Sequence, residues 1–224
     1  MYLNYLDRIL VLPISLAIAI LVCLGTFYLG RQIFSFLLFF GIPRFISVVS
    51  FSLGIASLSF FLNILMVLGL AKEPTLRIFA FSLIIVGCFV VFKWMIDVLT
   101  RIKEYDPRKL FKFSFRGNSS FIEYQSILSI SFCFLGIAII TMLPQSSGDS
   151  MNYHLAAAIN ILNKGHLYNE PEWFLGRLAG SGEVLVALGL AVKSEHLLPV
   201  INFSFLVQFL FMLAHSFKKK FASW

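Results

Sequence analysis

One polar stretch interrupts an otherwise apolar chain and carries the side chains best suited to chemistry. It covers residues 146–168, reads SSGDSMNYHLAAAINILNKGHLY, and contains Asp149, Tyr153 and His154. A carboxylate can accept a proton or orient a nucleophile, and an imidazole can bind a phosphate or a metal ion. Glu183 follows later in the same polar region. We therefore take these four residues as the candidate site.

Each of these residues also has a structural interpretation. Asp149 is a natural N-cap for the helix that follows it, and a capping carboxylate can act in catalysis as well. Tyr153 lies one turn farther on and can share its face. His154 is a phosphate or metal ligand, or an interfacial histidine satisfied by water. The helix dipole favours Glu183 near a helix start, and facing Asp149 it could instead complete a divalent-cation site.

Two short helices are expected to position the four residues. Apolar side chains recur at helical spacing through Met151, Leu155, Ala158, Ile159 and Leu162. Gly165 is typical of a helix end. This helix is too short and too polar to span a bilayer, so we expect it to lie on the membrane surface. A second short helix is expected to begin near Ser181 and Glu183 and to lie at the interface as well.

The rest of the chain has the composition of an integral membrane protein. It is 59% hydrophobic and 13% charged, with a mean hydropathy of +0.89, whereas soluble domains are about a quarter charged. About 20 apolar residues cross a bilayer as a helix. We predict an all-α, polytopic protein with about five transmembrane helices, at Ile9 to Leu29, Phe45 to Leu70, Leu76 to Trp94, Ile127 to Leu143 and Leu197 to Leu213.

Charge predicts how these helices cross the membrane. Residues 1–143 would hold four helices and a cytoplasmic loop at 95–120 with six basic and three acidic residues. Residues 144–196, with three basic and five acidic residues, would form the external loop. Residues 197–224 would form the fifth helix and a basic cytoplasmic tail. The N-terminus would then be outside and the C-terminus inside, with the turn from Lys72 to Arg77 as the exception.

This orientation accounts for the net charge of +7 without a nucleic-acid partner. The bilayer itself is the expected partner, and a bacterial inner (plasma) membrane is the expected location.

Two features within the predicted spans concern helix packing. Small residues on one face of the second span would let another helix approach closely: Ser47, Ser50, Gly54 and Ser57. Asn202 and Gln208 lie at membrane depth in the fifth span, where an amide must face protein or water. We expect helices from another chain to cover these two amides.

The region from Pro144 to Asn202 resembles the lipid-phosphosugar-dependent membrane glycosyltransferases of the GT-C superfamily, particularly the protein mannosyltransferase and aminoarabinose transferase type. The similarity lies in GDSMNYHL, an amphipathic helix ending in Gly, then PEW and GSGEVLVALGL. It implies sugar transfer from a polyprenyl-phosphate donor to an acceptor on the external face, with inversion. It also implies that Asp149 is the catalytic base, an acceptor-orienting carboxylate or a metal ligand. From their chemistry and their positions in the loop, Tyr153, His154 and Glu183 are the candidate substrate-binding residues.

The resemblance has two departures. Ala156 stands where relatives commonly have Pro, and relatives continue for several further membrane helices beyond the point that corresponds to Trp224. We therefore expect this chain alone to lack a complete active site. The alternative is a non-catalytic membrane subunit or transporter fragment whose external loop docks a partner through Trp173 and Phe174.

Overall fold

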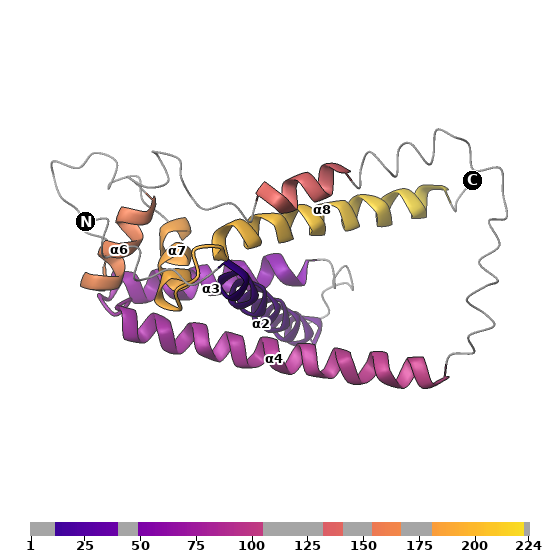
Figure 1. Ribbon diagram of the computed structural model, residues 1–224, viewed down its shortest axis with the longest axis horizontal. Coiled ribbons are helices and arrows are strands. Elements are labelled where there is room, and N and C mark those ends of the chain that lie inside the picture. The colour runs from indigo at the N-terminus through magenta and orange to yellow at the C-terminus, as the bar shows by residue number, and fades with distance from the viewer. Residues whose placement is uncertain (1–11, 40–48, 105–131, 141–153, 167–180, 222–224) are drawn as a thin grey trace.

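Helices account for nearly all the residues that the structure describes. The computed structural model describes residues 12–39, 49–104, 132–140, 154–166 and 181–221, which contain no strand. Residues 132–140 are helical. The labelled helices are α2 (Leu12–Phe39), α3 (Ser50–Val67), α4 (Glu73–Glu104), α6 (Leu155–Lys164), α7 (Ser181–Ala191) and α8 (Leu197–Phe221). In Figure 1, α4 and α8 run along opposite sides of the molecule, with α2 and α3 between them.

Within the described residues, three helices are long and apolar enough to cross a membrane. They are Leu12–Phe36, Ser50–Val67 and Glu73–Thr100, within α2, α3 and α4. The prediction of an all-α fold is confirmed for the described residues, and these three helices are candidate membrane spans, which is compatible with an integral membrane protein. The fourth predicted span is described only over residues 132–140. In α8 the described apolar part is the shorter Leu197–Leu210.

One predicted boundary changes. The helix α4 continues to Glu104, so the first part of the predicted loop at 95–120 is helical. Apolar residues such as Ile96 and Leu99 continue through this part and favour a helix over a loop. Residues 105–120 lie outside the described residues.

Glycines bring α2 into direct backbone contact with two neighbours. A Cβ at Gly54 of α3 would lie 2.1 Å from the carbonyl oxygen of Thr26, and a Cβ at Gly87 of α4 would lie 2.1 Å from that of Leu21. Close backbone approach provides the van der Waals contact that holds membrane helices together, because lipid is as apolar as their side chains. The interpretation of the small-residue face of α3 as a packing surface is confirmed at Gly54.

The structure shows what surrounds the two short helices that were predicted to lie at the interface. The helix α7 packs against α3, α4, α6 and α8, and its residues from Glu183 to Ala191 are buried on every side. Its sequence is apolar all round, so it has no polar face to turn towards water. The helix α6 ends at Gly165 as predicted, with φ +83°. Its apolar residues, Leu155 and Ile161 among them, are buried within the protein, where α6 packs mainly on α7.

The two amides of α8 differ in their surroundings. The hydroxyl oxygen of Ser52, on α3, lies 3.0 Å from Oε1 and 2.7 Å from Nε2 of Gln208. Gln208 therefore has a hydrogen-bonding partner within this chain. Asn202 is exposed on α8, so its expected cover by a helix of another chain stays a prediction.

Segments far apart in the sequence meet at one end of the bundle. The amide of Ala71, between α3 and α4, donates to the carbonyl oxygen of Gly165 at 3.0 Å. At the start of α4, Arg77 Nε donates to the carbonyl oxygen of Ala191, the last residue of α7, at 3.1 Å. A cation at a helix C-terminus is favourable. Arg77, one of the two basic residues that fit the predicted orientation poorly, thus has a structural role at the end of α7.

Candidate functional site

The structure brings together two of the four predicted site residues. Nδ1 of His154, at the start of α6, lies 2.8 Å from Oε1 of Glu183, in the first turn of α7. The two residues are 29 positions apart. Their contact joins the two short helices at the end of the bundle where α6 and α7 lie (Figure 1).

The two side chains differ in their access to the surface. The Glu183 side chain is 6% exposed and that of His154 is 38% exposed. A buried carboxylate is costly unless it is hydrogen-bonded, and His154 supplies such a partner. In turn, a carboxylate at one ring nitrogen fixes the orientation of an imidazole. The ring is thereby held at the protein surface, where it can exchange a proton or bind an anionic group.

Asp149 and Tyr153 lie outside the described residues, as do Trp173 and Phe174. The predicted N-cap at Asp149 and the predicted approach of Glu183 to Asp149 are therefore not described. Within the part of the chain that the structure describes, no three His, Cys, Asp or Glu side chains are placed to hold a metal ion. One oxygen of Glu183 is engaged by His154. The suggested divalent-cation site also needs Asp149, so it stays a prediction.

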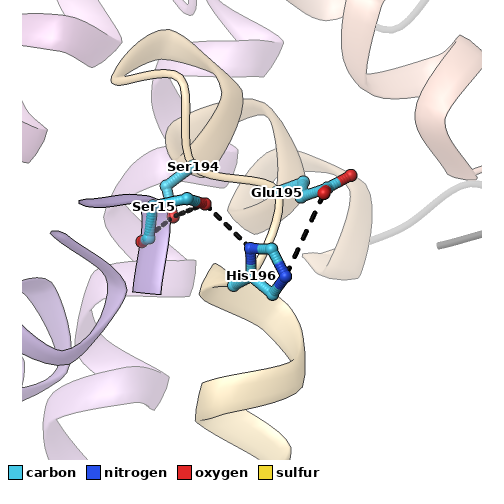
Figure 2. Close-up of polar contacts among 4 residues, drawn as sticks. All are labelled: Ser15, Ser194, Glu195 and His196. Carbon is cyan, nitrogen blue, oxygen red and sulfur yellow. Dashed lines mark hydrogen bonds and ion pairs between the residues drawn. The ribbon is translucent and has the colours of Figure 1, made fainter. Parts of the chain in front are cut away.

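A second polar cluster lies at the other end of α7 (Figure 2). It consists of Ser15 on α2 and three residues between α7 and α8, Ser194, Glu195 and His196. The Ser194 hydroxyl donates to the carbonyl oxygen of Ser15 at 2.7 Å. The Ser15 hydroxyl oxygen lies 2.8 Å from Nδ1 of His196 and 3.3 Å from the Ser194 hydroxyl oxygen. Nε2 of His196 lies 4.0 Å from Oε1 of Glu195.

These residue types are those of a nucleophile, a base and an acid, but their arrangement does not suit covalent catalysis. Ser15 is fully buried and His196 is 2% exposed, so a substrate cannot contact either one in this conformation. The 4.0 Å separation of His196 and Glu195 is also too long for a hydrogen bond. The cluster instead joins α2 to the turn between α7 and α8.

Sequence reasoning missed this cluster. The polar run from Ser194 to His196, between two apolar helices, was a visible signal. The partner Ser15 was not, because it is an isolated serine in an apolar helix, 181 residues away from His196.

The family of the chain is found by comparison with known families. Residues 107–223 match the DUF1420 N-terminal domain, which is more than half of the 224 residues. The chain belongs to the DUF1420 family. The matched region of this DUF1420 chain includes α6, α7 and α8 in full, and with them His154, Glu183 and the turn at 194–196. No curated protein and no solved structure matches the chain.

Proposed function

We propose that this DUF1420 chain is a membrane glycosyltransferase, or the N-terminal portion of one, similar to the GT-C superfamily. It would transfer a sugar from a polyprenyl-phosphate donor to an acceptor on the external face. The observation that supports this proposal is the 2.8 Å contact between His154 and Glu183. Both residues were candidates for substrate binding on the basis of their chemistry, and their contact holds an oriented, partly exposed imidazole at the end of a bundle of apolar helices.

The proposed reaction needs one proton acceptor and one site for the leaving phosphate. The acceptor oxygen bonds to the sugar carbon while the bond from that carbon to the phosphate oxygen breaks, and the phosphate leaves with the electron pair. Asp149 takes the proton of the acceptor. His154, held by Glu183, contacts the phosphate and stabilises the charge that develops on it.

The replacement of Asp149 by asparagine tests the proposal. We expect transfer to fall by about 100-fold or more, since general-base catalysis is worth this much, while the protein stays inserted and folded. The assay measures label transferred in isolated membranes from polyprenyl-phosphate mannose and polyprenyl-phosphate aminoarabinose. Asp97→Asn, an exposed residue of α4, is the matched control. Near-normal transfer by Asp149→Asn would sink the assignment.

The competing interpretation is a non-catalytic subunit or transporter fragment, and Asn202, which is exposed on α8, still supports it. The small-residue face of α3 contacts α2 through Gly54, and Gln208 is bonded to Ser52, so these two features have partners within the described part of the chain. In the same assay a docking loop would show greater sensitivity to Trp173→Ala and Phe174→Ala than to Asp149→Asn.

The site also requires that α6 and α7 lie on the external side of the membrane. The positive-inside rule supports this orientation. Lys193 is exposed beside the end of α7, and Thr100 is exposed towards the opposite end of α4. With Cys88 and Cys133 replaced by serine, we expect a membrane-impermeant maleimide to label Lys193→Cys in intact cells and Thr100→Cys only after permeabilisation. The reverse pattern would contradict the orientation and with it the external active site.

A further inference from the structure

We infer that Ser15, Ser194 and His196 are positioning residues, which fix α7 along its axis and thereby hold Glu183 against His154. This inference concerns the geometry of the site and does not depend on which reaction the site performs. It follows from the way α7 is held at its two ends.

The middle of α7 has no directional contact to set its position. Every side chain from Val184 to Ala191 is apolar or absent, and these residues are buried among neighbouring helices. Close packing limits where α7 can lie, and hydrogen bonds, which need specific distances and angles, add a directional constraint on its axial position. The polar groups at the two ends of α7 supply that constraint.

The turn after α7 is rigidly joined to that helix. The amide of Ser194 donates to the carbonyl oxygen of Gly189 at 2.9 Å, and the amide of Lys193 donates to that of Leu190 at 2.9 Å. A Cβ at Gly189 would lie 2.5 Å from the Ser194 carbonyl oxygen, so the turn folds directly onto the helix. Ser194 and α7 therefore move together.

Ser15 ties this turn to a helix that is itself fixed. The helix α2 is in backbone contact with α3 and α4 at the glycine positions. The carbonyl oxygen of Ser15 accepts a hydrogen bond from the Ser194 hydroxyl, and the Ser15 hydroxyl contacts Nδ1 of His196. All three residues are at most 2% exposed, so water cannot replace these bonds. Arg77 also binds the end of α7, but its side chain is 45% exposed and pairs with Glu73 as well.

The contact between Glu183 and His154 tolerates only a small axial shift of α7. A helix rises about 1.5 Å per residue, so a shift of α7 by one residue can lengthen the 2.8 Å contact between Glu183 and His154 by up to about 1.5 Å, which takes it beyond hydrogen-bonding distance. From Glu183 to Ala191 the helix is about 12 Å long. A helix this short moves as one unit, so a shift at one end also moves the other end. The cluster in Figure 2 thus controls the candidate site from the opposite end of α7.

Cross-linking tests this inference without an activity assay. Cysteines replace His154 and Glu183 in a chain that also carries Cys88→Ser and Cys133→Ser, and a short bis-methanethiosulfonate reagent joins them in isolated membranes. Trypsin cuts at Lys164 and Arg177, between the two positions, so mass spectrometry of the linked peptides gives the cross-linking rate. We expect Ser194→Ala to lower this rate several-fold and Ser194→Thr, which keeps a hydroxyl, to retain it.

Ser52→Ala is the matched control, since it also removes a serine hydroxyl bonded across two helices, and we expect it to leave the rate unchanged. Equal rates in Ser194→Ala and Ser52→Ala would overturn the inference. If Ser194→Ala is not recovered from the membrane, Ser15→Ala decides, because it removes the contact to His196 and keeps the bond from Ser194 to the backbone. An unchanged rate in that variant would overturn the inference too.

Discussion

Glu183→Gln is expected to lower transfer by about 100-fold, within the range for loss of electrostatic stabilisation of the transition state, while the protein remains folded. Glutamine has the size of glutamate but carries no charge, so the negative charge that orients the His154 ring is lost. Stability should change little, because the amide of glutamine can still hydrogen-bond the ring and this buried side chain, 6% exposed, no longer carries a charge with a desolvation cost. The measurement is transfer of labelled sugar in membranes, alongside the melting temperature in detergent.

Glu73→Gln is the control for this prediction. Glu73 also pairs with a cationic side chain, Arg77, and also lies in the first turn of a helix, but its side chain is 32% exposed. We expect near-normal transfer from this variant. If Glu183→Gln transfers as well as Glu73→Gln does, the buried carboxylate has no part in the chemistry and the site must be sought elsewhere.

Gly87→Ala is expected to destabilise the bundle by about 2 kcal/mol or more, at the upper part of the range for overpacking. The added carbon would lie 2.1 Å from the carbonyl oxygen of Leu21. Because that oxygen belongs to the backbone of α2, no side chain can rotate out of the way, and α2 and α4 must separate. The melting temperature of the purified protein in detergent measures the effect.

Gly136→Ala should not destabilise the protein. A Cβ at Gly136, in the helical segment 132–140, meets nothing within 4 Å. Alanine favours a helix over glycine by about 1 kcal/mol, so this variant should melt at the same temperature or higher. Equal destabilisation by both substitutions would mean that helix contact at Gly87 does not limit stability.

Some properties of this protein follow from local sequence alone. The apolar runs predict α2, α3 and α4 as spans, because a segment in lipid must satisfy its backbone hydrogen bonds within itself, and length and composition then suffice. The end of α6 at Gly165 and the start of α7 at Ser181 were also predictable, since glycine adopts the left-handed conformation there and the helix dipole favours Glu183 in the first turn.

Other properties were decided by the tertiary structure. The sequence nominated His154 and Glu183 separately, but it paired Glu183 with Asp149, and only the packing of α6 on α7 shows Glu183 against His154. It did not show that four neighbouring helices bury α7, or that Ser52 hydrogen-bonds Gln208.

The physical reason is the same in each case. Whether a helix forms depends on residues within one or two turns of one another, and this information is local. Which side chains meet depends on the rotation and axial position of each helix against the others, and close packing of the whole bundle sets both. The sequence by itself therefore determined the apolar spans, the limits of the short helices and the residues able to do chemistry. Only the tertiary structure joined His154 to Glu183, and Ser15 to His196.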